Sequence, residues 1–217
     1  LGRFAAELIA RNQMTEALLR LTLSRGVGVR GYSPKGADQP TLVMTLHPMG
    51  APVSDPAPSD PIRWRAHTAS SRLPANEPLA HFKTCNKLVQ ILARAEAEAA
   101  GAEEALLTNT DGFVVEGASS NLFWIQNGSV CTPPLTDGIL RGVTRGVVCE
   151  LCEALRMPVR ERHLRPPELL QTDAVFVSLS SLGIVELAAI DGTRLGSSPV
   201  VKQLADAYQA LVRAECH

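Results

Sequence analysis

Four polar features of the sequence have the types and the order that small-molecule chemistry would need. Lys83 stands just before a helical pattern, and Glu116 ends a short apolar strand pattern. Thr144 begins a second helical pattern, and Ser180 and Ser181 follow a buried strand pattern. An amine serves as nucleophile or base, and the free N–H groups at a helix start bind anions. Each residue alone also has an ordinary interpretation, as a solvated charge, a helix cap or a turn residue.

Taken together, these features are the set that pyridoxal phosphate requires. A lysine forms a Schiff base with this cofactor, and a carboxylate keeps its ring nitrogen protonated so that the ring accepts electrons. Backbone amides and hydroxyl groups hold the phosphate. The sequence therefore predicts pyridoxal 5′-phosphate as the cofactor.

Longer stretches of the chain resemble a known family, the class IV aminotransferases, or fold-type IV pyridoxal-phosphate enzymes. The resemblance runs from Lys83 almost to the C-terminus. It is carried by "KTCNKL", "EALLTNTDGFVVEGASSNLFWI", "VCTPPLTDGILRGVTR" and "DAVFVSLSSLGIVELAAIDG". It implies a two-domain α+β fold like that of D-amino-acid aminotransferases, with a small α+β domain and a larger pseudo-barrel domain. The active site would lie between the domains, near a homodimer interface.

The resemblance also implies roles for individual residues. Lys83 would be the catalytic lysine that carries the cofactor, and Glu116 would pair with the ring nitrogen. The residues implied to bind the phosphate are Val143, Thr144, Ser180 and Ser181. The family usually has a phosphate-binding arginine in an H-x-x-R-L-like helix well before the domain boundary. No such motif precedes Lys83, so we expect an upstream segment to be missing from this sequence.

We expect three parts along the chain. Residues 1–71 would form the small domain, 72–80 an interdomain stretch without helical or strand period, and 81–217 the large cofactor-binding domain. In the small domain, a helix over residues 2–12 would precede a strand over 19–24 and a returning strand.

Two tight hairpins are predicted in the large domain. "EALLTN" and "FVVE" flank Asp111-Gly112, and "NLFWIQ" and "SVCT" flank Asn127-Gly128. Hairpins of this kind indicate an antiparallel sheet. Helical spacing predicts further helices from Leu88, from Thr144 and from Pro199.

The stretch "GVGVRG", Gly26–Gly31, fits the G-x-G-x-x-G pattern of dinucleotide-binding loops. The turn residues of "YSPKGADQP" follow it instead of a helix, so a strand-to-strand loop is the better interpretation. Within the family, "LTLSRGVGVRGYSP" looks like the substrate-side segment of 4-amino-4-deoxychorismate lyases. That likeness makes Arg25, Arg30 and Tyr32 candidates to bind substrate carboxylates, with Arg72 as a weaker candidate.

The residue after Asn86 bears on which member of the family this is. Branched-chain aminotransferases usually have a tyrosine there, whereas this chain has Lys87 and the lyases often have a basic residue. The first expectation is therefore 4-amino-4-deoxychorismate lyase, which makes 4-aminobenzoate and pyruvate for folate biosynthesis. A D-amino-acid or branched-chain transaminase is the alternative. A non-catalytic ligand-binding relative ranks lower, and a nicotinamide-dependent oxidoreductase lowest.

Composition narrows the class of protein. The 217 residues are 45% hydrophobic with a net charge of −1 and scattered basic residues, so we expect neither nucleic acid nor a membrane as partner. The partners expected are a small amino substrate and a second copy of the chain. Five cysteines without a disulfide framework indicate a cytoplasmic location. The five histidines form no ligand pair, and we expect no metal site.

Overall fold

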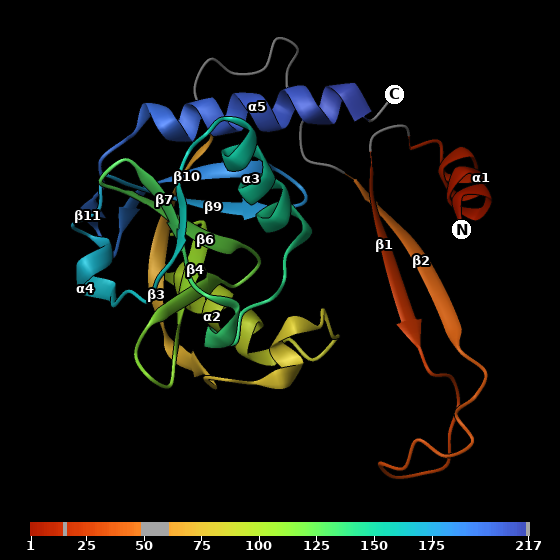
Figure 1. The fold of residues 1–217 in the computed structure, drawn as a ribbon. Helices are drawn as coiled ribbons and strands as arrows, with labels where there is room; N and C mark the ends of the chain where they lie inside the picture. Colours follow the sequence, from red (N-terminus) through yellow and green to blue (C-terminus); the bar gives the residue numbers. More distant parts are fainter. Residues whose placement is uncertain (15–16, 49–60, 216–217) are drawn as a thin grey trace. The chain divides into compact units, whose positions relative to one another are not determined.

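The computed structural model describes residues 1–14, 17–48 and 61–215 (Figure 1). The chain divides into two compact units, Leu1–Ala57 and Pro58–His217. Across the described residues, no helix combines the length and the apolar character needed to cross a membrane.

The smaller unit contains one helix and a two-stranded antiparallel sheet. α1 (Gly2–Asn12) precedes β1 (Ala17–Ser24), which pairs along its whole length with β2 (Thr41–Pro48). These elements confirm the predicted helix, strand and returning strand.

The glycine-rich stretch connects β1 to β2, and residues 25–40 contain no helix. Gly26 has a φ of 98°, and a Cβ atom there would lie 1.8 Å from the carbonyl oxygen of Gln39. Only glycine allows this close approach of the two sides of the loop. The strand-to-strand interpretation is confirmed, and a dinucleotide-binding loop is excluded because the helix that such a loop needs is missing here.

The larger unit is built around a closed ring of six strands. Neighbouring strands of the ring pair in the order β10–β3–β4–β5–β6–β9, and β9 pairs back onto β10. Their bounds are β3 (Arg63–Leu73), β4 (Glu104–Asn109), β5 (Val114–Gly117), β6 (Asn121–Gln126), β9 (Ala174–Leu179) and β10 (Gly183–Ile190). Three further strands branch from the ring: β7 (Ser129–Thr132) pairs with β6, β8 (Val159–Glu161) pairs with β7, and β11 (Thr193–Arg194) pairs with β10. The ring is the pseudo-barrel that was predicted.

Helices cover the outside of this ring (Figure 1). α2 (Leu88–Ala99) packs on β3 and β4, while α3 (Val143–Ala154) and α5 (Pro199–Glu215) pack on β9, on β10 and on each other. The short elements are α4 (Pro166–Leu169) and the 3-10 turns η1 (Pro78–His81) and η2 (Leu135–Asp137).

Side chains alternate between the inside and the outside of the ring, as strand geometry requires. On β6, Leu122 and Trp124 are buried in the interior cluster, while Phe123 is buried under α3 and α5, stacked on Phe176 with 4.9 Å between ring centroids. On β4, Leu106 faces the interior, whereas the next residue, Leu107, packs in the cluster under α2. The two faces of each strand therefore carry different side-chain environments.

The hairpins about Asp111-Gly112 and Asn127-Gly128 are confirmed as β4–β5 and β6–β7. Asn127 and Gly128 have φ values of 50° and 71°, the left-handed pair that a tight two-residue hairpin needs. Not every pairing is antiparallel: β3 runs parallel to both β4 and β10, and β7 runs parallel to β8.

The position of β3 places the boundary between the two units earlier in the chain than the sequence predicted. The sequence placed a domain boundary at residues 72–80, with 1–71 in the small domain, but β3 pairs with β4 and β10 inside the larger ring. The two compact units separate earlier, between Ala57 and Pro58. Hydrogen bonds to strands distant in sequence hold residues 63–73 in the larger unit, and no local pattern of these residues signalled that partnership.

Candidate active site

Lys83 lies on the segment between η1 and α2, and Lys87 is the N-cap residue of α2. The Lys83 side chain is exposed, and that of Lys87 is half-buried. Both ammonium groups lie close enough to Glu116 for their charges to lower the pKa of its carboxyl group, Lys87 more strongly than Lys83. The charges of both lysines therefore act on Glu116, and the role of Lys83 toward a cofactor stays a prediction.

Glu116 stands near the end of β5 and is only 7% exposed. Its Oε2 atom accepts a hydrogen bond of 2.9 Å from the backbone N–H of Leu140. Burial is the largest influence on this group and raises the pKa of Glu116 to about 7, against the opposing effects of Leu140, Lys87 and Lys83. A buried carboxyl group of this kind, beside two lysines, can exchange its proton near neutral pH.

A row of polar residues crosses three neighbouring strands at this point. Glu116 on β5 is paired with Asn121 on β6, and Asn121 is paired with Ser178 on β9. Directly paired residues point to the same face of a sheet. That face is the outer one, because Asn121 alternates with the interior residue Leu122. The Ser178 hydroxyl is buried and has no hydrogen-bond partner among the described residues.

The start of α3 adjoins this row. Asn121 donates through Nδ2 to the carbonyl oxygen of Leu140, at 2.9 Å. A Cβ atom on Gly142, the N-cap residue of α3, would lie 1.9 Å from Asn121 Oδ1. Only glycine fits at this turn, and no described side chain caps the helix. The N–H groups of the first turn are therefore left for an anion.

The predicted phosphate-binding residues have different surroundings. Thr144, in the first turn of α3, is 5% exposed, whereas the Val143 side chain is exposed and could contribute only through its backbone. Ser180 and Ser181 follow β9, in the turn that leads to β10; Ser180 is exposed and Ser181 half-buried. Their roles toward a phosphate stay predictions.

The predicted substrate-binding residues lie in the smaller unit. Arg25, Arg30 and Tyr32 are all exposed on the loop between β1 and β2. Their role toward the substrate stays a prediction. Arg72 lies in β3, within the larger unit.

Three residues of this site were given no individual role from the sequence, namely Asn121, Gly142 and Ser178. Asn121 looked like the first residue of a strand, Gly142 preceded the helix start, and Ser178 looked like part of a serine-rich turn. Only the pairing of β6 with β9 places them side by side. A glycine immediately before a helix that has no Ser, Thr, Asp or Asn cap was the one available signal for Gly142.

Comparison with known proteins identifies the family. The family model "Amino-transferase class IV" matches residues 1–190. The chain belongs to this family, whose members are pyridoxal-phosphate-dependent enzymes.

A protein from Methanocaldococcus jannaschii, provisionally assigned as a branched-chain-amino-acid aminotransferase, is 35% identical over 195 residues. That alignment covers 89% of this chain and 66% of the relative, so the chain spans about two thirds of the relative's length.

Two solved structures show the same fold. One, from Legionella pneumophila, is provisionally assigned as a 4-amino-4-deoxychorismate lyase; it superposes with a TM-score of 0.85 and 26% identity over 96% of this chain and 75% of that one. The other is the branched-chain amino acid aminotransferase from Thermobaculum terrenum in its pyridoxal-phosphate form, with a TM-score of 0.81 and 26% identity over 97% of this chain and 69% of that one.

The residues described above fit the cofactor of this family. The uncapped start of α3, with buried Thr144 beside it, suits a phosphate group. The unpartnered Ser178 hydroxyl supplies a further donor on the same face. The buried Glu116 carboxyl group suits a protonated ring nitrogen, and Lys83 supplies the amine.

Proposed function

We propose that this chain is a pyridoxal-phosphate-dependent enzyme acting on a small amino substrate, and specifically a 4-amino-4-deoxychorismate lyase that releases 4-aminobenzoate and pyruvate. The observation that carries the proposal is the row of Glu116, Asn121 and Ser178, on whose buried carboxyl group the charges of Lys83 and Lys87 act. The uncapped start of α3 adjoins that site.

Each part of the site has a task in such a reaction. When bound, pyridoxal phosphate supplies an electron-accepting ring that makes the bonds at the substrate's amine-bearing carbon labile. Glu116 would pair with the ring nitrogen and keep it protonated. The first turn of α3, with Thr144, would hold the phosphate. Lys83 would hold the cofactor through its ε-amine, and the same amine, once free, would take up the proton from the substrate's amine-bearing carbon.

Lys87 favours the lyase. It stands where branched-chain aminotransferases usually have a tyrosine, and it places a second positive charge beside Glu116. A substrate with two carboxylates gains from additional cationic groups, and Arg25 and Arg30 are proposed to supply them. The structural likeness to the Legionella protein supports the same assignment.

A branched-chain or D-amino-acid transaminase is the second candidate. The 35% identity to the Methanocaldococcus jannaschii protein favours the branched-chain activity. The early proton transfer by Lys83 is common to both reactions, so the residues of the larger unit serve either one. The reactions differ in whether a 2-oxo acid is needed to complete the turnover.

The test is to supply the full chain, loaded with pyridoxal phosphate, with 4-amino-4-deoxychorismate and no 2-oxo acid. The lyase proposal expects steady pyruvate release that is lost in Lys83→Ala. Turnover of branched-chain or D-amino acids only when a 2-oxo acid is added, with no pyruvate from aminodeoxychorismate, would replace the lyase by the transaminase. Unchanged cofactor absorbance in Lys83→Ala would contradict the role of Lys83 in either reaction.

We propose further that the enzyme works as a cytoplasmic homodimer. The apolar side chains of Leu88, Ile91 and Leu92 on α2 are each more than half exposed, which is costly in water and suits a subunit contact. The free thiols of Cys85, Cys131, Cys149 and Cys152 suit a reducing compartment. Light scattering of the purified full chain tests the dimer, and a single-chain mass would contradict it.

A further inference from the structure

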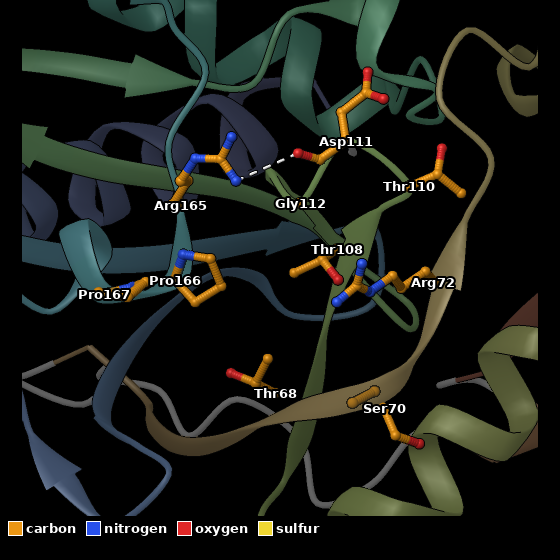
Figure 2. Close-up of a pocket in the computed structure, with 11 residues that line it drawn as sticks. Thr68, Ser70, Arg72, Thr108, Thr110, Asp111, Gly112, Arg165, Pro166 and Pro167 are labelled. Carbon is orange, nitrogen blue, oxygen red and sulfur yellow. Dashed lines mark hydrogen bonds between the residues drawn. The ribbon is translucent and has the colours of Figure 1, made fainter.

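A polar cavity opens on the larger unit, and Glu116, Asn121 and Ser178 are not among the residues that line it. It has a volume of about 520 Å³. Three segments line it: residues 68–72 of β3, residues 108–112 at the end of β4 and the turn after it, and residues 165–167 at the start of α4 (Figure 2).

None of the candidate cofactor-site residues lines this cavity. Glu116 is paired with Leu107, so both side chains point to the outer face. The next residue, Thr108, is paired with Val114 of the interior cluster and points to the inner face. The cavity is therefore separate from the candidate cofactor site.

A bulge in β3 shapes one wall of the cavity. Thr68 is paired with Leu106, and Arg72 is paired with Thr108. Between these two pairs, β3 therefore contains two more residues than β4. Glu96 on α2 fixes the bulge: its carboxylate accepts hydrogen bonds of 3.0 Å from the Ser70 N–H and of 2.9 Å from the Ser70 hydroxyl. A bulge held in this way aims side chains at a site instead of continuing the sheet.

Two guanidinium groups line the cavity. Arg72 and Arg165 form no ion pair with an acidic side chain of the described residues. Figure 2 shows the Arg72 guanidinium turned toward Thr108, which is only 7% exposed. The carboxylate of Asp111, the one acidic side chain in the lining, points away from Arg72 in the same view. The cavity therefore presents positive charge and hydroxyl groups together.

Arg165 is held in place by its neighbours. Its guanidinium lies 4.9 Å from the centre of the Phe113 ring and donates to the carbonyl oxygen of Asp111 at 3.4 Å. Gly112, with a φ of 83°, makes room for it, because a Cβ atom there would lie 2.8 Å from Arg165 Nη1. These contacts orient the guanidinium of an otherwise exposed side chain, which leaves it open to an anion.

We propose that this cavity is a second ligand site, which binds a small oxyanion through Arg72 and Arg165. Guanidinium groups bind carboxylates and phosphates through paired, charge-assisted hydrogen bonds. The hydroxyl of Thr108 supplies a further donor beside Arg72, and the rings of Pro166 and Pro167 form an apolar wall for a carbon skeleton. The ligand expected is therefore a small organic carboxylate or a phosphate ester. Separate carboxylate and phosphate probes distinguish these two possibilities in the experiment.

The experiment is calorimetric titration of the full chain, loaded with pyridoxal phosphate so that the cofactor's own phosphate site is filled. Inorganic phosphate and malonate are used as separate probes. Saturable binding of either probe is expected, and Arg72→Gln or Arg165→Gln is expected to weaken it at least tenfold, as the loss of one charge-assisted pair would. The tighter probe identifies the anion type.

Arg194→Gln is the matched control, because Arg194 is an exposed arginine on β11 that does not line the cavity. It should leave probe binding unchanged, and cofactor absorbance should be the same in all variants. Arg165→Lys keeps the charge but loses the fork and should fall between wild type and Arg165→Gln. No saturable binding by either probe, or equal weakening in Arg194→Gln, would overturn the proposal. A loss of cofactor absorbance would bear on the cofactor site instead.

Discussion

The buried carboxyl group of Glu116 should make the stability of the cofactor-free protein depend on pH. Its pKa is raised from the usual 4.5 to about 7 in the folded chain. Between these values, the folded state holds a proton that the unfolded state has released. The free energy of unfolding therefore falls as the pH rises through this window, and below pH 4.5 Glu116 imposes no penalty.

The size of the effect follows from the two pKa values. One pKa unit corresponds to about 1.4 kcal/mol, so the full penalty is about 3 kcal/mol, most of which develops between about pH 5 and pH 8. Glu116→Gln removes the titration but keeps an oxygen that can accept from the Leu140 N–H. We therefore expect the free energy of unfolding of Glu116→Gln, taken relative to wild type, to be about 2 to 3 kcal/mol higher at about pH 8 than at about pH 5.

The assay is urea unfolding of cofactor-free wild type and Glu116→Gln at about pH 5 and at about pH 8. At each pH, the difference in the free energy of unfolding between the two proteins is taken. Titrations elsewhere in the chain cancel in this difference. Glu150→Gln, at an exposed position of α3, serves as the control and should change stability by less than about 0.5 kcal/mol at either pH. A Glu116→Gln difference that is the same at both pH values would refute the assignment of Glu116 as a desolvated carboxyl group.

Three other predictions follow from particular contacts. Gly142→Ala should weaken pyridoxal-phosphate affinity at least tenfold in a spectroscopic titration, because its Cβ atom would meet Asn121 Oδ1. The control is Gly146→Ala, whose Cβ atom meets nothing within 4 Å and which should instead stabilise α3 by about 0.5 to 1 kcal/mol. Equal cofactor affinity in the two variants would contradict the role of the α3 start in binding the phosphate. Arg94→Met should lower the free energy of unfolding in urea by about 2 to 3 kcal/mol, because it removes the cation beside the fully buried Glu104 carboxylate. The donors that remain to this carboxylate are the Ser119 and Ser120 hydroxyls and the Ala105 N–H. Glu98→Gln, which breaks only the exposed pair to Arg94, should cost less than about 0.5 kcal/mol. Exposed Cys85 should react with a thiol reagent in the native protein well before buried Cys152, whose pKa is raised to about 12 by burial; peptide mapping that finds Cys152 labelled first would contradict this order.

Local signals in the sequence were enough for some parts of the fold. Asn127-Gly128 fixes its hairpin through its own backbone angles, and the spacing of apolar residues from Leu88 was enough to predict α2. Both signals depend on residues close together in the chain. The roles expected for Lys83 and Glu116 come from stretches that resemble the family, and they stay predictions.

Other parts depend on contacts between distant residues. β3 is held by parallel neighbours, and parallel pairing leaves no turn residues to mark it. Asn121 and Ser178 become neighbours only when β6 and β9 pair. The cavity beside Arg72 needs three separate segments and a bulge fixed by Glu96. A pattern within one segment does not predict which distant segment it will contact.

The most direct test of the account asks which lysine carries the cofactor. The full chain is incubated with pyridoxal phosphate, reduced with borohydride to fix the cofactor covalently, and digested for peptide mass mapping. Lys87 is the internal control, because its charge also lies beside Glu116. The account predicts the added mass on Lys83. Labelling of Lys87 in its place, or no specific labelling, would contradict the central claim.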